Sequence, residues 1–204
     1  MNKEILIGEK ILHHSDIERI TTDIANRLDQ RLSNDKTLPV VVGILKGGAP
    51  FMCDIVRKMK TIVDLDFMDV SSYSGTKSTG KINIKMDLSV DVTGKEVVII
   101  DDVIDTGLTS YFLDKYLIEK KKAKSLINVF LINKTPRRKY DVKVDYCGLT
   151  YDQNKFLIGY GLDYNGLLRN IFAVYAMAQE DIEKLDAIAK EDASEAALEA
   201  KQKQ

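Results

Sequence analysis

The residues best suited to chemistry lie in one stretch, Val97–Ser110, which reads VVIIDDVIDTGLTS. An apolar run is followed by the acidic pair Asp101–Asp102 and then by the small residues of Asp105–Thr109. This order predicts a buried strand, a loop and the first turn of a helix. Helix N-termini bind phosphate through free backbone N–H groups and the helix dipole. The loop is therefore suited to a monophosphate, which its amides and two threonine hydroxyls would hold.

The carboxylates around this loop restrict the molecule to which that phosphate belongs. The loop has one glycine and no lysine, so it is not a Walker A sequence, and three carboxylates would repel a triphosphate. A ribose 5-phosphate fits better, because its diol can donate hydrogen bonds to Asp101 and Asp102. These two residues would then face the ribose hydroxyls and a metal ion, and Asp105 would lie nearer the anomeric carbon.

Two other interpretations of the acidic pair are open at this point. A strand that ends in an acidic turn can simply cap the next helix. Response-regulator receivers also place an acidic pair at a strand end in an α/β fold, usually after the first strand. Here 100 residues precede the pair, which disfavours a receiver.

The whole stretch resembles the signature with which phosphoribosyltransferases bind phosphoribosyl pyrophosphate (PRPP). In that signature an apolar strand, two acids and two apolar residues precede Asp-Thr-Gly and a further threonine. The resemblance implies that Asp105 is the catalytic residue. It also implies contacts to the phosphate and ribose of PRPP from Asp101, Asp102, Asp105, Thr106, Gly107, Leu108 and Thr109. The family commonly has glutamate as the first acid, so Asp101 implies a less direct contact to the ribose.

Two loops resemble those that bind and cover pyrophosphate in the purine phosphoribosyltransferases. Leu45-Lys46-Gly47-Gly48 resembles the pyrophosphate loop, which implies contacts from Lys46 and Gly47 and, often, a cis peptide bond that leads into the lysine. Gly47 would let the backbone approach the ligand closely. Ser72 and Tyr73 begin a polar stretch that resembles the catalytic lid, whose closure excludes water from the reactive ribosyl centre.

Two further segments resemble the base-reading parts of enzymes that act on 6-oxopurines. Lys134 resembles the lysine that meets the exocyclic oxygen of the base. A cation there would favour hypoxanthine or guanine over adenine, whose amino group cannot accept a hydrogen bond. The stretch Lys155–Tyr164, KFLIGYGLDY, resembles the family's KFVVGYxLDY. It implies that Phe156 stacks on the purine ring, that backbone groups around Leu157 read the base edge, and that Asp163 is also one of the purine-binding residues.

The same resemblance implies a magnesium ion and a complete reaction. Asp163 would hold magnesium partly through water, with Asp101 and Asp102 as further ligands, and Arg169 would contact pyrophosphate. The chain would then convert PRPP and hypoxanthine or guanine to pyrophosphate and IMP or GMP, as a homodimer or homotetramer. A regulatory module that senses PRPP without turnover is the second hypothesis. Such modules tend to lose the catalytic acid, here Asp105, the lid or the base-reading segment, and this chain has all three.

The elements that must position these residues follow an α/β pattern. Continuously apolar runs, typical of strands covered on both faces, predict strands over 40–45, 97–100 and 126–132. A further strand is expected over 63–71, and 82–86 alternates like a strand. Helices are expected over 16–32, 50–59 and 109–122, the first with a capping box formed by Ser15 and Glu18. From residue 140 onward the pattern is less regular.

The resemblance implies a type I phosphoribosyltransferase fold, in which helices flank a central, mostly parallel sheet. A small hood would be formed by the N-terminal segment and residues 145–178. Residues 1–178 would form one domain, and residues 179–204, which match nothing in the family, would be a polar helical or disordered tail.

Composition and segment patterns limit the expected partners and the expected cellular compartment. A net charge of −1 gives no reason to expect nucleic acid or an anionic membrane as a partner. Cys53 and Cys147 are far apart and outside any CxxC pair, which favours reduced thiols. No signal-peptide pattern and no apolar run of membrane-spanning length is visible, so we expect the cytoplasm.

Overall fold

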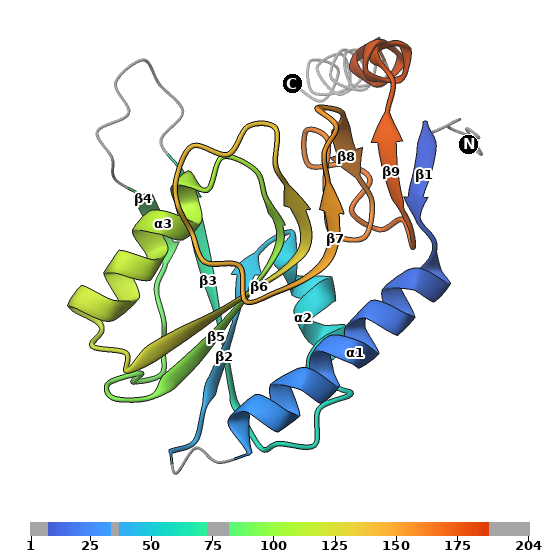
Figure 1. Cartoon of the computed structure of the whole chain (residues 1–204). Helices are drawn as coiled ribbons and strands as arrows, with labels where there is room; N and C mark the ends of the chain where they lie inside the picture. The colour runs from blue at the N-terminus through green and yellow to red at the C-terminus, as the bar shows by residue number, and fades with distance from the viewer. Residues whose placement is uncertain (1–7, 34–36, 73–81, 188–204) are drawn as a thin grey trace, which may run out of the picture.

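The computed structural model describes residues 8–33, 37–72 and 82–187. They form two β-sheets of unequal size (Figure 1). Across the described ranges, no helix is long and apolar enough to cross a membrane.

The larger sheet has six strands in the order β4-β3-β2-β5-β6-β7. All neighbouring pairs run parallel except β3 and β4, which are antiparallel. The strands are β2 (Val40–Leu45), β3 (Asp64–Ser72), β4 (Ile82–Met86), β5 (Glu96–Ile104), β6 (Ser125–Lys134) and β7 (Tyr146–Tyr151). The expected mostly parallel α/β sheet is therefore confirmed.

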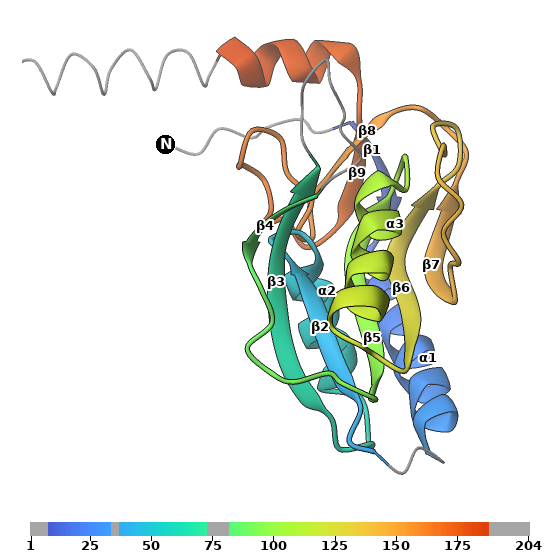
Figure 2. The same ribbon diagram turned by 90° about the vertical axis from the view of Figure 1, so that its left-hand side faces the viewer.

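Helices cover both faces of this sheet, which explains its continuously apolar strands. The helices α1 (His14–Leu32) and α2 (Gly48–Val56) pack on one face, and α3 (Leu108–Lys115), which continues into a π-helical turn η1 (Tyr116–Lys120), packs on the other. Figure 2 shows α3 in front of the sheet and α1 and α2 behind it. Because side chains alternate along a strand, Val41 joins the core under α1 and α2, whereas Val40 and Val42 join the core under α3.

The hood is the second, three-stranded antiparallel sheet, with the order β1-β9-β8. It consists of β1 (Glu9–Leu12), β8 (Phe156–Ile158) and β9 (Val174–Met177). The expected hood segment therefore starts too early at residue 145. Tyr146–Tyr151 is β7 of the large sheet, because it pairs in parallel with β6.

The described part of the expected polar tail is a helix with one apolar face. Residues from Gln179 to Ala187 are helical. Leu185 is only 3% exposed and packs against Ile158 and Met177 of the hood. This part of the tail is therefore attached to the hood by apolar packing.

Other boundaries also differ from those expected from sequence. The first helix begins at His14, and the Asp16 carboxylate accepts a hydrogen bond from the His13 N–H at 3.0 Å, so Ser15 is not its N-cap. The strand expected over 97–100 continues to Ile104, because pairing with β6 extends that far. The helix expected over 50–59 spans Gly48–Val56, and the one expected over 109–122 becomes π-helical at Tyr116.

A buried acid between α3 and β6 makes stability depend on pH. Asp114 Oδ2 accepts a hydrogen bond from Asn128 Nδ2 at 2.9 Å, while its Oδ1 and the Asn128 Oδ1 are buried without partners among the described residues. Burial raises the pKa of Asp114 to about 6, against the hydrogen bond from Asn128, and the Asp145 charge adds to the rise. Because this pKa is higher than in an unfolded chain, the stability contributed by the protonated form is present below about pH 4 and is lost as pH rises through 6.

We therefore expect Asp114→Asn to stabilise the protein at pH 7.5 by on the order of 1–3 kcal/mol, since it removes a buried charge. An amide can also donate to the unpaired Asn128 Oδ1. The gain should shrink at pH 4.5, and denaturant unfolding at both pH values measures it. The exposed change Asp152→Asn is the control. An equal gain at both pH values, or none at pH 7.5, would contradict this account of Asp114.

Candidate active site

A cleft of about 300 Å³ opens at the carboxyl ends of β2 and β5. This is where ligands bind in open α/β sheets. Eleven residues predicted from sequence line it together: Lys46, Gly47, Asp101, Asp102, Asp105, Thr106, Gly107, Leu108, Thr109, Asp163 and Arg169. The structure thus brings the acidic loop, the lysine-glycine loop and part of the hood to one site.

The predicted phosphate loop, Asp105–Thr109, takes its shape from one residue with a left-handed backbone conformation. Gly107 has φ 80° and is followed at once by α3, and an added Cβ would lie 2.9 Å from the Tyr140 carbonyl oxygen. The Thr106 hydroxyl accepts a hydrogen bond from the Leu108 N–H at 3.3 Å. The loop therefore presents its amides at the N-terminus of a helix, the arrangement that suits a phosphate.

Asp101 and Asp102 form the floor of the cleft within β5, and not after it as the sequence suggested. Burial raises the pKa of Asp101 well above its usual range, and the neighbouring Asp102 charge adds to the rise. Burial also raises the pKa of Asp102, although bonding to Asp101, the Val103 N–H and the Arg169 charge oppose it. Such a pair is costly without a compensating partner, so it favours a ligand that supplies hydroxyl donors or positive charge.

The Lys46–Gly47 loop lies directly against this acidic pair. A Cβ on Gly47 would lie 1.6 Å from Asp102 Oδ2, so any larger residue here would displace the Asp102 carboxylate. The peptide bond between Leu45 and Lys46 is cis, as the family resemblance implied.

Asp105 is positioned as an acceptor that lacks a donor. Its Oδ2 pairs with Arg137 Nη1 at 3.2 Å, and its Oδ1 is buried with no hydrogen-bond partner in the described residues. A buried carboxylate oxygen without a partner is unfavourable. It is the kind of atom that a ligand's N–H would satisfy.

The hood contributes a cation to the cleft. Arg169 Nη2 pairs with Asp163 Oδ1 at 2.6 Å, and its Nη1 donates to the Gly161 carbonyl at 2.6 Å. The Gly166 N–H donates to Asp163 Oδ2, also at 2.6 Å. This fixed guanidinium is suited to an anionic group in the cleft.

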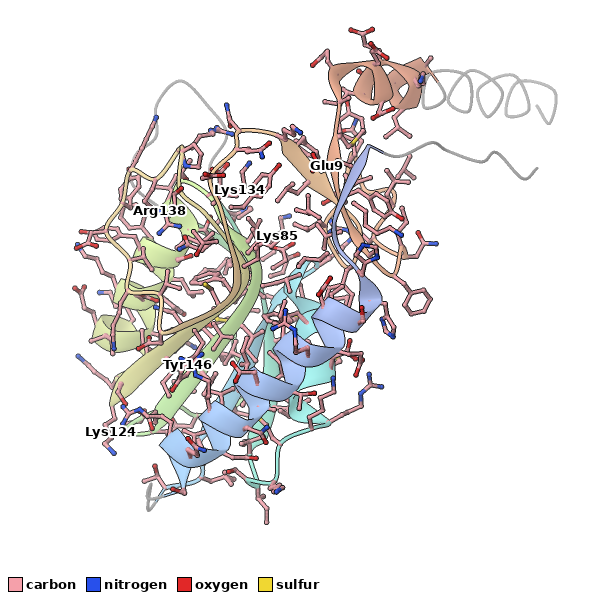
Figure 3. All side chains as sticks on the ribbon, turned by 45° about the vertical axis from the view of Figure 1, so that its right-hand side comes forward. Glu9, Lys85, Lys124, Lys134, Arg138 and Tyr146 are labelled. Carbon is pink, nitrogen blue, oxygen red and sulfur yellow. The ribbon has the colours of Figure 1, made fainter. Side chains whose placement is uncertain are left out.

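Of the predicted purine-binding residues, Asp163 lines the cleft, whereas Lys134, Phe156 and Leu157 lie outside its lining. Lys134 ends β6, is only 7% exposed, and its Nζ donates to the Lys155 carbonyl at 3.0 Å. Lys155 precedes β8 and pairs with Glu9 Oε2 of β1 at 2.9 Å. Figure 3 shows Lys134 at the upper end of the large sheet and Glu9 across from it in the hood.

Phe156 is an aromatic residue left open on a hood strand. Its side chain is 44% exposed, whereas its neighbour Leu157 is 6% exposed, so Leu157 offers a ligand only its backbone. The rings of Phe156 and Tyr164 lie nearly perpendicular, with 5.5 Å between their centroids. The exposed Phe156 ring is therefore suited to stacking on a ligand.

Arg138 is a positioning residue that sequence reasoning missed. Its Nε donates to the Asp105 carbonyl at 3.0 Å, and its Nη2 donates to the Ile104 carbonyl at 3.0 Å and to Asn133 Oδ1 at 2.6 Å. It thereby ties the phosphate loop to the end of β6, close to Lys134 (Figure 3). Nothing in the local sequence distinguishes it from its neighbour Arg137.

The predicted lid lies almost entirely outside the described residues. Ser72 is the last residue of β3 and pairs with Ile82 of β4. Tyr73 and the polar stretch that follows are outside the described ranges.

The predicted magnesium ligands do not form a cage of their own. In the described part of the chain, no three His, Cys, Asp or Glu side chains are grouped to hold a metal. Magnesium, however, usually binds one or two carboxylates and takes its other oxygens from water and substrate phosphates. The buried carboxylates of Asp101 and Asp102 fit that mode, since a cation would compensate their charge.

Comparison with known proteins places this site in a family. The phosphoribosyl transferase domain matches residues 8–165. The hypoxanthine-guanine phosphoribosyltransferase of Aquifex aeolicus is 42% identical over 166 residues, which cover 81% of this chain and 92% of that protein. That of Bacillus subtilis is 39% identical with 90% of its length covered. The chain is also 41% identical to the bifunctional protein TilS/HprT of Listeria monocytogenes, but it spans only 26% of that protein's length.

Solved structures support the same family relationship as the sequence comparisons. A hypoxanthine phosphoribosyltransferase from Staphylococcus aureus superposes with a TM-score of 0.79 at 37% identity, covering 88% of this chain and 97% of that one. One from Trypanosoma cruzi, in complex with the product IMP, gives 0.78 at 25% identity, covering 89% of this chain and 99% of that one.

The chain belongs to the phosphoribosyltransferase family, with the type I fold. Within that family it is of the hypoxanthine-guanine phosphoribosyltransferase type.

The contact between Gly47 and Asp102 predicts a sharp effect of a small substitution. Gly47→Ala should lower kcat/KM for phosphoribosyl transfer by about 100-fold, because the added methyl displaces the Asp102 carboxylate and misplacement by an ångström costs about that much. Steady-state kinetics measure it. Gly94→Ala is the control, because it strains a left-handed turn (φ 70°) outside the cleft and should therefore lower stability without lowering kcat/KM. Full activity in Gly47→Ala would show that this contact does not position the acidic pair.

Proposed function

We propose that this chain transfers the 5-phosphoribosyl group of PRPP to hypoxanthine or guanine, releasing pyrophosphate and forming IMP or GMP. The observation that carries the proposal is the single cleft that combines a phosphate loop, a buried acidic pair and cations from two loops. The names of the relatives and the IMP complex of the Trypanosoma cruzi structure support the choice of base.

Each part of PRPP has a matching part of the cleft in this proposal. The 5-phosphate would bind the amides and hydroxyls of Asp105–Thr109 at the start of α3. The ribose diol would donate hydrogen bonds to Asp101 and Asp102. Pyrophosphate would lie against Lys46, the Gly47 backbone and Arg169. Such a layout places the anomeric carbon near Asp105.

Positioning and charge would dominate the chemistry. A ring nitrogen of the base attacks the anomeric carbon as pyrophosphate leaves, through a transition state with oxocarbenium character. The carboxylates beside the ribose would stabilise that developing positive charge, since charge stabilisation is strong in a site from which water is excluded. Ser72 and Tyr73 would start the lid that excludes it.

Asp101 and Asp102 would hold magnesium together with oxygens of PRPP, and Asp163 would contribute through water. Magnesium would neutralise the charge on the departing pyrophosphate. Asp163 already holds Arg169, so the same residue would link the metal to the pyrophosphate-binding guanidinium.

Asp105 would accept the purine N7 proton as general base. Its Oδ1, which is buried and has no hydrogen-bond partner among the described residues, would be the acceptor, and Arg137 on Oδ2 would keep the carboxylate oriented. A module that only sensed PRPP would have no need for such an acceptor, which favours the enzyme over the sensor.

Asp105→Asn should therefore reduce kcat by ~10²–10⁴-fold, the usual loss on removal of a general base, while PRPP still binds. Initial rates measure the first effect and titration calorimetry with magnesium and PRPP the second. Asp23→Asn on the exposed face of α1 is the control for charge. Unchanged turnover in Asp105→Asn would rule out this role.

Lys134 would recognise the oxygen of a 6-oxopurine. Its buried ammonium now donates to the Lys155 carbonyl, next to Phe156, and it can turn from that carbonyl to a base stacked on Phe156. A cation at this point rejects adenine, since an amino group would face it donor to donor.

Lys134→Ala, and Lys134→Met, which keeps the aliphatic stem, should both raise KM for hypoxanthine and reduce discrimination against adenine. We expect kcat/KM for hypoxanthine to fall about tenfold or more, because hydrogen bonds to charged groups contribute about 1.5–3 kcal/mol. Rates with each base measure it. Lys139→Ala in the same loop, with an exposed side chain, should change neither quantity. An unaltered preference between the bases in both Lys134 variants would remove Lys134 as the reader.

Two wider expectations remain predictions. The family resemblance implies a homodimer or homotetramer, and the sequence favours the cytoplasm.

A further inference from the structure

The C-terminal helix is fixed to the hood at both ends of its described part. At its start, Asp181 Oδ2 accepts hydrogen bonds from the N–H groups of Ala178 and Gly8, each at 3.2 Å. Towards its end, Leu185 is buried against Ile158 and Met177. Figure 1 shows this helix lying across the end of the hood, beyond β8 and β9. It lies beyond residue 165, where the match to the family domain ends.

One polar contact joins this helix to the base-reading segment. The Tyr164 hydroxyl donates a hydrogen bond of 2.7 Å to Asp186 Oδ1, although 22 residues separate them in sequence. This bond is the largest cause of a raised pKa for Tyr164, so the hydroxyl stays protonated and remains a donor at neutral pH. The Tyr164 ring belongs to the same apolar cluster as Leu185. Its position is thus set from the helix side by both packing and hydrogen bonding.

The ring of Tyr164 also contacts the proposed purine platform, Phe156. Its ring and that of Phe156 are nearly perpendicular, at 89°, with 5.5 Å between centroids. An edge-to-face contact of this kind restricts the tilt of the contacted ring. Phe156 is 44% exposed, and among the described residues Tyr164 is the aromatic ring that packs against it.

We propose that the C-terminal helix is a positioning element for the purine subsite, acting through Asp186 and Tyr164 on the ring of Phe156. The inference rests on the proposed function, since it takes Phe156 as the surface on which the base stacks. Tyr164 and Asp186 touch no reacting atom. Their effect should therefore be on the binding of the base and not on the chemical step.

The test compares the KM for hypoxanthine with the KM for PRPP in Asp186→Ala and Tyr164→Phe. Each variant removes the hydrogen bond and leaves the aromatic pair in place. We expect the KM for hypoxanthine to rise about three- to tenfold, which is less than the full effect of a lost hydrogen bond to a charged group, because this bond acts on the base only through Tyr164 and Phe156. The KM for PRPP and kcat should stay within about twofold, because the phosphate loop and Asp105 are untouched. The double variant should be no worse than the single ones, since both remove one bond.

Glu183→Ala is the matched control, because Glu183 is exposed on the same helix and should leave both KM values unchanged. An unchanged KM for hypoxanthine in Asp186→Ala and Tyr164→Phe would overturn the inference. An equal rise in both KM values, or the same effect from Glu183→Ala, would also overturn it, since either shows a general loss of structure. Failure of the proposed function itself would be visible separately, as a lack of turnover by the unaltered chain.

Discussion

The site depends on how closely two neighbouring parallel strands approach at their carboxyl ends. β2 leads into Gly47 and β5 carries Asp102, and the Asp102 carboxylate occupies the place where any larger residue would put its Cβ. This contact packs a backbone loop against a buried acidic pair. It therefore sets, in one step, the distance between the proposed pyrophosphate loop and the proposed ribose site. It also buries the two carboxylates, so that they need the hydroxyls and the cation that PRPP with magnesium would bring.

The hood contributes side chains to the proposed site that the large sheet does not provide. It supplies Arg169 over the acidic floor, and it carries Phe156 beside Lys134 at the end of β6. The bond from Lys134 to the Lys155 carbonyl and the Arg138 bonds to the phosphate loop run between these parts. The C-terminal helix packs on the far end of the hood, and we propose that through this packing it influences how a purine binds.

Sequence predicted those features that are encoded in contiguous residues. The phosphate loop could be interpreted because strand, acids, glycine and helix start follow one another within Val97–Ser110, and the apolar strands because burial on both faces leaves a continuous run. Arg138 could not be found, since its role arises only when the fold brings residues 133–138 beside residues 104–105. The strands of the hood were missed because they have three or four residues each. The apolar face of the C-terminal helix was missed because Ile182 and Leu185 are too few to give a clear period.

The central claim is that one cleft transfers a phosphoribosyl group and that Lys134 and Phe156 make the acceptor a 6-oxopurine. The most direct measurement is a competition in one vessel, with PRPP, magnesium and equal concentrations of hypoxanthine, guanine and adenine, in which the nucleotides formed are separated and quantified. The account predicts IMP, GMP or both, with pyrophosphate released in equal amount and no significant AMP. Formation of AMP at a comparable rate, or of no nucleotide at all, would contradict it.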